Sequence, residues 1–216
     1  MDIKMLASES YSEQEIIPRI IAGEKKLYEI LVRRFNPILY KIGRTYGYGH
    51  EDTQDLMQDT FIDAFRNLAA FEGRSAFKTW IIRIMLNNCY RKKQGKGFKN
   101  MVLTEISENS TPMFSAENDQ TGQMLIRREF GQILERALLK LPLDHRIVFT
   151  LRSLQGFNVA ETAELLRISE TNVKTRLSRA RAGLRIEMEK NFSAEEIFEF
   201  NLVYCDAMVE RVMQKI

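Results

Sequence analysis

The sequence has few of the residues from which metal sites and disulfide frameworks are built. Its 216 residues include two cysteines, Cys89 and Cys205, and two histidines, His50 and His145. The cysteines lie far apart and form no CxxC pair, and neither histidine is near a cysteine. This inventory excludes a structural zinc site and a disulfide framework, and it predicts a protein without a cofactor.

Long apolar runs are also missing. No stretch approaches the roughly 18 apolar residues of a membrane span. The first ten residues, MDIKMLASES, lack the charged and then apolar layout of a signal peptide. A hydrophobic content of 44% and a charged content of 28% are typical of a soluble globular protein, long enough for one large or two small domains. We therefore expect a cytoplasmic protein with no membrane insertion.

Residues 158–185 predict two short helices around a tight corner. Asn158 and Glu161 have the spacing of a capping box at the start of a helix over residues 159–166. Ser169 is a good N-cap for the second helix. The pattern predicts a helix-turn-helix.

The second of these helices has one apolar stripe and one basic face. Its apolar residues recur at spacings of four, three and four: Val173, Leu177, Ala180 and Leu184. The remaining face carries Lys174, Arg176, Arg179, Arg181 and Arg185. Solvated arginines on an ordinary surface helix are the alternative, but the capped helix and corner before them favour binding in the DNA major groove.

The N-terminal half begins with a polar, mildly acidic segment, residues 1–19, which we expect to be loosely held. Apolar residues at spacings of four and three then predict a helix over residues 20–48. A second helix, over residues 52–68, carries a row of acids at Asp52, Asp55, Asp59 and Asp63. Like charges at this spacing repel each other by a few tenths of a kcal/mol per pair. The row therefore suggests a basic partner, with a plain solvated face as the alternative.

A third helix, over residues 77–93, follows a loop at 71–76 and belongs to an acid-free stretch. No acid occurs from Gly73 to Thr104. Interleaved with its cations are rings and amides: Phe77, Trp80, Asn87, Asn88 and Tyr90. Cations hold phosphates, rings stack on bases and amides bind unpaired base edges, so the pattern fits single-stranded nucleic acid. A core position is the alternative for Phe77 and Trp80, and the favoured one for Phe77.

Residues 95–122 break the helical pattern and are too long for an ordinary connection within one compact domain. We predict a flexible acidic linker here, held in a basic channel of a partner or acting as a spacer. The fold class is therefore all-α, with small helical domains at 20–94 and 123–190. Residues 191–216 predict a separate amphipathic helix, begun by a capping box at Ser193 and Glu196. It would pack on the preceding domain, or bind a regulator or a second copy.

In this order, these features resemble the bacterial extracytoplasmic-function (ECF) sigma factors, the two-domain members of the sigma-70 family. The resemblance covers residues 20–190. Residues 55–61, DLMQDTF, are similar to the family's polymerase-binding helix, and residues 77–81, FKTWI, with Asn87 are similar to its promoter-melting helix. The stretch from Leu141-Pro142 to Arg146 and the helix-turn-helix resemble the end of its second domain.

The resemblance implies roles for particular residues, with core RNA polymerase and promoter DNA as partners. Polymerase would be bound by Asp52, Asp55, Gln58, Asp59 and Asp63. The -10 element, with its melted non-template strand, would be bound by Arg74, Lys78, Trp80, Arg83, Asn87, Asn88 and Arg91. The duplex -35 element would be bound by Lys174, Thr175, Arg176, Ser178, Arg179 and Arg181, with the arginines mainly on phosphates. An anti-sigma factor is implied by the family alone.

Two residues depart from the family pattern. Arg91 stands where many members have Asp, and Arg167 stands in the helix-turn-helix corner where many have Gly. We expect the second departure to be mild, because a shifted turn avoids the left-handed conformation that glycine serves there.

Other functions explain less of the sequence. An ordinary helix-turn-helix regulator that acts without polymerase leaves the acidic helix and the acid-free stretch unexplained. A helical interaction module leaves the basic helix unexplained. An enzyme is least favoured, because the sequence has no nucleophile elbow, phosphate-binding glycine loop or cleft-like carboxylate pair.

Overall fold

The computed structural model describes residues 11–94 and 123–190, with the side chains of 123–130 excepted. All regular structure in these ranges is helical, which confirms the all-α prediction. The first part contains α2 (Glu13–Ile21), η1 (Lys25–Leu27), α3 (Tyr28–Thr45), α4 (His50–Arg66), η2 (Leu68–Ala70) and α5 (Phe77–Gln94). The second contains α6 (Gln123–Lys140), α7 (Leu143–Phe149), η4 (Thr150–Leu154), α8 (Val159–Leu166) and α9 (Glu170–Glu189). The predicted linker at 95–122 and the predicted C-terminal helix, with Cys205, lie outside the described residues.

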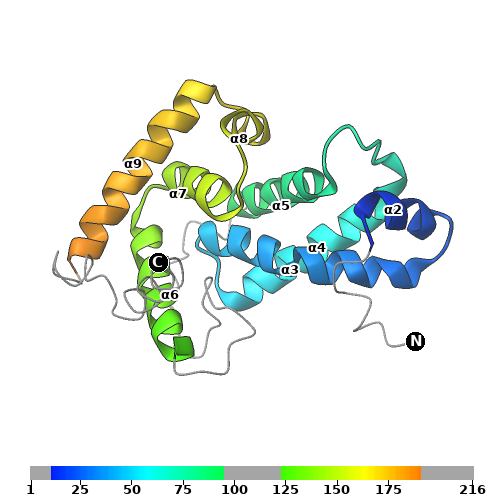
Figure 1. Ribbon diagram of the computed structural model, residues 1–216, viewed down its shortest axis with the longest axis horizontal. Helices are drawn as coiled ribbons and strands as arrows, with labels where there is room; N and C mark the ends of the chain where they lie inside the picture. The colour runs from blue at the N-terminus through cyan, green and yellow to red at the C-terminus, as the bar shows by residue number, and fades with distance from the viewer. Residues whose placement is uncertain (1–10, 95–122, 191–216) are drawn as a thin grey trace, which may run out of the picture.

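Helices α3, α4 and α5 form the core of the first domain, with α2 at one end of it (Figure 1). Leu31, Leu39, Ile81 and Met85 are fully buried among them. The Tyr48 hydroxyl donates to the Cys89 carbonyl oxygen at 2.8 Å and joins the connection between α3 and α4 to α5. Phe77 is 1% exposed, so the core position favoured for it is confirmed.

The expectation of a loosely held lead-in is wrong for residues 13–19, which belong to α2. Ser12 and Glu15 cap this helix reciprocally: the Ser12 hydroxyl accepts from the Glu15 amide, and the Glu15 carboxylate accepts from the Ser12 amide. Ile16, Ile17 and Ile20 are buried against the rest of the domain. Acidic residues in the first turn make this segment polar by composition and so obscure the apolar stripe. The Ser-x-x-Glu capping box at its start is the sequence signal of the helix.

The local structure of the helix-turn-helix agrees with its prediction. The Glu161 amide donates to Asn158 Oδ1 at 2.9 Å, and the Asn158 amide donates to Glu161 Oε2 at 2.7 Å. Ser169 caps α9 by accepting from the Asn172 amide at 3.2 Å. In α9, Val173, Ala180 and Leu184 are buried and Leu177 is half-buried, so the predicted apolar stripe faces α6, α7 and α8.

The expectation that the corner avoids the left-handed conformation is wrong. Arg167 has φ 54° and ψ 47°, the conformation in which helix α8 ends. Its amide and that of Ile168 donate to carbonyl oxygens of the last turn of α8, which satisfies groups that would otherwise lack partners. These hydrogen bonds require a residue in the left-handed conformation at this position. The backbone therefore adopts that conformation although the residue is arginine and not glycine.

Replacing Arg167 with glycine is expected to stabilise the protein by about 0.5–1 kcal/mol. Relief of the left-handed strain, about 1–2 kcal/mol, exceeds the entropic cost of glycine, about 0.5–1 kcal/mol. Urea unfolding of the full chain measures the difference. Arg167→Ala is the matched control, because it removes the same side chain but keeps Cβ and the strain. Equal stability of the two variants would contradict the prediction.

Candidate nucleic-acid and protein interfaces

The acidic stripe of α4 divides into two exposed acids and two that interact with α5. Asp55 and Asp59 are exposed, and neither forms an ion pair with another described residue. Asp52, in contrast, accepts from Lys92 Nζ at 2.6 Å. Asp63 accepts from Asn88 Nδ2 at 3.3 Å. Together with exposed Gln58, which lies between them on the same face, Asp55 and Asp59 form an acidic face open to a basic partner.

Apolar side chains continue this acidic face toward the end of α4. Ile62 is 40% exposed and Phe65 36%. Ile62 also lines a groove of about 560 Å³ together with Asp55 and Asp59. Exposed apolar groups beside charged groups are common in protein interfaces, so the surface combines both kinds of contact.

One side of α5 lines an open groove of about 650 Å³ together with α4. Trp80 and exposed Asn87 lie along it, and Tyr90 is 57% exposed at its edge. The Trp80 ring is held by Phe71 and Phe77, with ring centroids 5.2 and 5.5 Å away. The groove therefore offers a fixed ring and a free amide, the groups that bind unpaired bases.

Asn88 lies behind the groove surface. It is 5% exposed, its Nδ2 donates to Thr60 Oγ1 at 3.2 Å and to Asp63, and its Oδ1 accepts from Arg91. The Arg91 side chain is 72% exposed, and its Nη2 atom lies 3.7 Å from Asp63 Oδ2. Asn88 thus joins α4 to α5 and orients Arg91, while Arg91 itself faces solvent.

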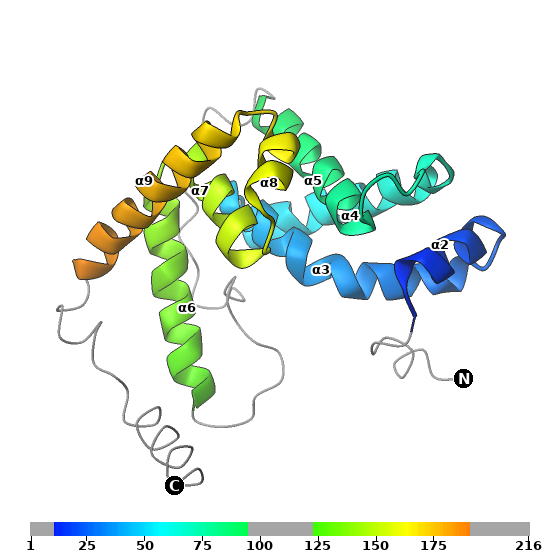
Figure 2. The same ribbon diagram turned by 45° about the horizontal axis from the view of Figure 1, so that its top comes forward.

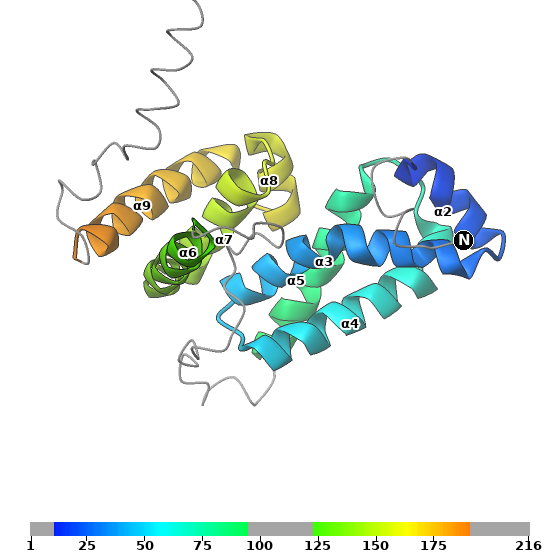
Figure 3. The same cartoon turned by 60° about the horizontal axis from the view of Figure 1, so that its bottom comes forward.

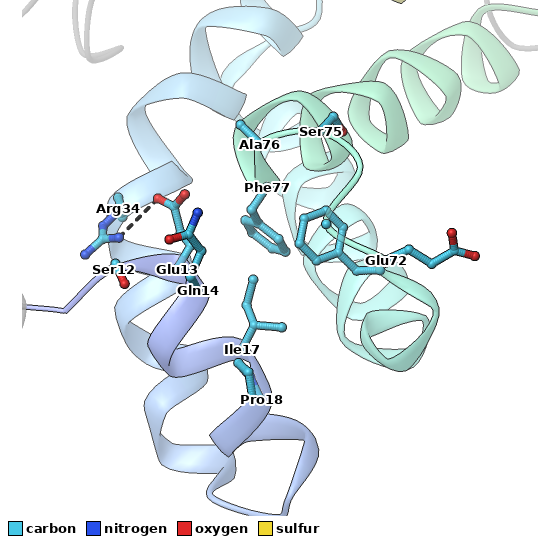
Figure 4. A pocket seen from close by; sticks show the side chains of 12 residues that line it. Ser12, Glu13, Gln14, Ile17, Pro18, Arg34, Glu72, Ser75, Ala76 and Phe77 are labelled. Carbon is cyan, nitrogen blue, oxygen red and sulfur yellow. Dashed lines mark hydrogen bonds and ion pairs between the residues drawn. The ribbon is translucent and has the colours of Figure 1, made fainter.

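A pocket of about 510 Å³ lies between α2 and the loop that precedes α5 (Figure 4). Phe77 and Phe71 form its aromatic side, at right angles to each other with centroids 5.5 Å apart. Ile17 and Pro18 of α2 lie on the Phe77 side of the same pocket. Helix α2 thereby supplies one wall of a pocket beside the loop that carries Arg74.

The other side of α5 faces the second domain. Lys78 Nζ donates to the Gln155 carbonyl oxygen at 2.6 Å and lies 4.9 Å from the centre of the Phe157 ring. Arg83 forms an ion pair with Glu164 of α8 at 2.7 Å. Burial lowers the pKa of Lys78. The structure therefore separates the residues predicted for the -10 element into an open set and a set in contact with the second domain.

The basic face of α9 is exposed at five of its six predicted DNA-binding positions: Lys174, Thr175, Ser178, Arg179 and Arg181. Arg176 is half-buried and pairs with Asp144 of α7 at 3.4 Å. That pair draws the guanidinium toward α7, away from the centre of the exposed face.

Arg74 at the N-terminal side of α5 is exposed and pairs with Glu72 in the same loop. Over the described ranges, no cluster of three or more histidine, cysteine or acidic side chains could hold a metal ion. No helix within those ranges is both long and apolar enough to cross a bilayer.

Both domains match known protein families. The family described as "Sigma-70 region 2" matches residues 31–97, and "Sigma-70, region 4" matches residues 131–184. The ECF RNA polymerase sigma-E factor of Haemophilus influenzae is 30% identical over 178 residues, which cover 81% of this chain and 94% of that protein. The sigma-E factor of Escherichia coli K12 is 30% identical over 190 residues, covering 82% and 94%. The ECF sigma factor SigM of Mycobacterium tuberculosis H37Rv is 29% identical over 174 residues, covering 80% and 83%.

Solved structures share the fold. CnrH, in complex with the cytosolic domain of CnrY, has a TM-score of 0.58 at 23% identity and covers 83% of this chain and 99% of its own. The sigma factor RpoE of Bartonella quintana, in complex with the anti-sigma factor NepR, has a TM-score of 0.55 at 22% identity, covering 73% and 95%.

Proposed function

This chain belongs to the extracytoplasmic-function sigma factors of the sigma-70 family, and we propose that its separate exposed surfaces divide the work of such a factor. It binds core RNA polymerase and directs it to promoter DNA. We assign polymerase binding and -10 melting to residues 20–94 with α2, and -35 binding to residues 123–190. The observation that carries this assignment is the occurrence, in one chain, of an unpaired acidic face, an aromatic and amide groove, and a basic recognition helix.

The acidic face of α4 would bind a basic surface of the polymerase. Asp55, Gln58 and Asp59 are its members, because their side chains are exposed and available. Asp52 and Asp63 would support the face from within, since both interact with α5. Ile62 would add apolar contact beside the charges.

The groove and the pocket of the first domain would hold the melted non-template strand. Unstacking a base costs a few kcal/mol, which stacking on a fixed ring and hydrogen bonds to an amide must offset. Trp80 and Asn87 supply these contacts in the groove, and the half-buried Phe71 ring at the wall of the pocket suits a base that has left the strand. Arg91, exposed at the end of the groove, would contact phosphate.

Helix α9 would lie in the major groove of the -35 element. Lys174, Thr175 and Ser178 near its N-terminus would reach base edges, and Arg179 and Arg181 would hold phosphates. Arg176 would contact DNA less directly, because its guanidinium forms an ion pair with Asp144.

The chain would act through binding, with no reaction of its own, in the cytoplasm where transcription begins. Identity of 30% across 94% of the sigma-E factors supports this function over that of an ordinary helix-turn-helix regulator. An anti-sigma partner stays a prediction from the family. Run-off transcription tests the proposal: core RNA polymerase is incubated with fragmented DNA of the source organism, with and without this protein. Discrete new transcripts are expected; polymerase-independent binding to a duplex site, without transcripts, would contradict the proposal.

The division between base and phosphate contacts predicts different effects at two cations of α9. With the holoenzyme, Arg179→Ala should weaken binding to all promoters alike and reduce the slope of log affinity against log salt by about one unit. Lys174→Ala should instead change the preference among -35 sequences, by about 1–3 kcal/mol at one base pair. Binding to a set of single-base -35 variants at several salt concentrations measures both. If the two variants behave alike, the division is wrong.

A further inference from the structure

The guanidinium of Arg91 is held by a buried amide between α4 and α5, which pack side by side (Figures 2 and 3). Its Nη2 group donates to Asn88 Oδ1, and Asn88 is 5% exposed. Asp63 Oδ2 lies 3.7 Å from the same Nη2 atom, which is longer than a charge-assisted hydrogen bond of about 2.7–2.9 Å. The closer partner is therefore a neutral carbonyl oxygen, which orients the guanidinium without neutralising its charge.

The orientation of the Asn88 amide is determined by its partners on α4. A carboxylate accepts and does not donate, so the contact with Asp63 Oδ2 at 3.3 Å requires the amide nitrogen on that side. The same nitrogen donates to Thr60 Oγ1 at 3.2 Å. Thr60 is fully buried, and its hydroxyl donates to the Leu56 carbonyl oxygen at 2.7 Å, so it accepts from Asn88. The amide oxygen must therefore face Arg91.

Arg91 lies on the same face of α5 as the residues proposed to bind the melted strand. The groove of about 650 Å³ is lined by Trp80, Ile84, Asn87 and Arg91, at spacings of four, three and four. Asn87 and Arg91 are one helical turn apart, about 6 Å along the axis. A guanidinium has five N–H donors in a planar fork, and 72% of the Arg91 side chain is exposed, so donors remain for a ligand in the groove.

We propose that Asn88 and Asp63 are positioning residues that hold Arg91 as a clamp for one phosphate of the non-template strand, and that this contact sets the register of the strand in the groove. The inference rests on the proposed function. Because the guanidinium is fixed relative to Asn87, the phosphate that it binds determines which base reaches that amide and the Trp80 ring. A cation on an unrestrained side chain would instead bind whichever phosphate is nearest.

A scan of neutral phosphates tests the clamp in the holoenzyme. The probe is a mapped promoter, premelted across the -10 element, in which one methylphosphonate at a time replaces a phosphate of the non-template strand. The unmodified protein should lose about tenfold in affinity at the phosphate that Arg91 holds, as expected for a hydrogen bond between charged groups. With Arg91→Ala this penalty should disappear, and the slope of log affinity against log salt should fall by about 0.7 unit.

The register makes a second prediction for the same probe. Stacked nucleotides advance by about 3.4 Å along a strand, so a separation of about 6 Å corresponds to one or two nucleotides. The phosphate identified with Arg91→Ala should therefore lie one or two nucleotides from the base whose substitution affects the unmodified protein but not Asn87→Ala. A larger separation would overturn the proposed register.

The positioning role is tested at Asn88, which lies behind the groove surface. Asn88→Leu removes the amide and keeps a side chain of similar size, so the penalty at the identified phosphate should fall at least threefold although Arg91 is intact. Arg91→Lys keeps the charge but lacks the planar fork. It should leave the salt slope unchanged and lower the same penalty. Arg66→Ala removes an equal charge from an exposed residue of the neighbouring groove and should leave the scan unchanged.

Three results would contradict the inference in different ways. If Arg91→Ala removes no single penalty, the clamp does not exist. If the penalty persists in Asn88→Leu, the amide does not position Arg91; should that variant fail to bind polymerase, persistence of the penalty in Arg91→Lys would overturn the positioning role instead. Transcription that still depends on the unmodified protein would leave the proposed function in place in both cases. An absence of transcripts with the unmodified protein would overturn the proposed function, and this inference with it.

Discussion

Core RNA polymerase should no longer be directed to promoters by a variant with Asp55→Arg and Asp59→Arg. Both carboxylates are exposed on one face of α4, and neither is paired with a cation among the described residues. Reversal therefore costs little in the free protein but places two positive charges against a basic partner. Loss of one member of an interfacial charge pair costs about 2–5 kcal/mol, which is about thirtyfold or more in affinity for each site. Co-purification with core polymerase and run-off transcription measure the effect.

A matched control separates this loss from a general effect of charge. Glu24→Arg makes the same charge change at an exposed acid between α2 and η1, on the far end of the first domain, and breaks only a surface pair with Arg19. Exposed pairs contribute about 0–1 kcal/mol, so this variant should bind polymerase normally. Unchanged polymerase binding by the double variant would contradict the interface.

Substitution of Asp63 should have a different effect from substitution of Asp55 and Asp59. This acid is half-buried and accepts from Asn88, which also donates to Thr60. Its side chain therefore supports the packing of α4 on α5, and we expect its contribution to polymerase binding to be indirect. The sequence placed Asp63 in a uniform acidic row, whereas the structure distinguishes it by its partners.

Local features of the fold could be predicted from the sequence because their causes are local. The capping box at Asn158, the cap at Ser169 and the apolar stripe of α9 each depend on residues within one or two turns. The corner at Arg167 could not be predicted, because the hydrogen bonds at the end of α8 outweigh the side chain's preference. Helix α2 was missed because acidic residues in its first turn surround an apolar stripe of three isoleucines.

Contacts between the domains could not be predicted for a different reason. Arg44 and Glu135 are 91 residues apart, and neither carries a motif that points to the other. The same applies to Lys78, whose basic neighbourhood indicates nucleic acid while its observed partner is a carbonyl oxygen of the second domain. A charge pattern predicts the chemistry of a partner, and only the tertiary structure shows which partner occupies the site.

The close packing of α3 on α4 predicts a large loss of stability at Gly43. A Cβ at this position would lie 2.6 Å from Thr53 Cγ2 and 3.1 Å from Met85 Cε. Thr53 is fully buried, and its branched Cβ restricts the side chain, so its methyl group moves aside less readily than the end of a long side chain. Overpacking of about 1–3 kcal/mol should exceed the helix propensity that alanine gains over glycine, about 1 kcal/mol. Gly43→Ala should therefore destabilise the first domain by about 1 kcal/mol and by no more than about 2 kcal/mol.

Urea unfolding followed by Trp80 fluorescence measures this loss, because Trp80 is the single tryptophan and lies in the first domain. Gly183→Ala in α9 is the matched control. Its Cβ would also meet a carbon at 2.6 Å, but that atom is Leu141 Cδ2, the end of a side chain that can rotate away. This second variant should lose nothing. Thr53→Ser removes the obstructing methyl group, so it should reduce the cost of Gly43→Ala in a double-mutant cycle; a cost that stays the same in the Thr53→Ser background would show that the clash is not its cause.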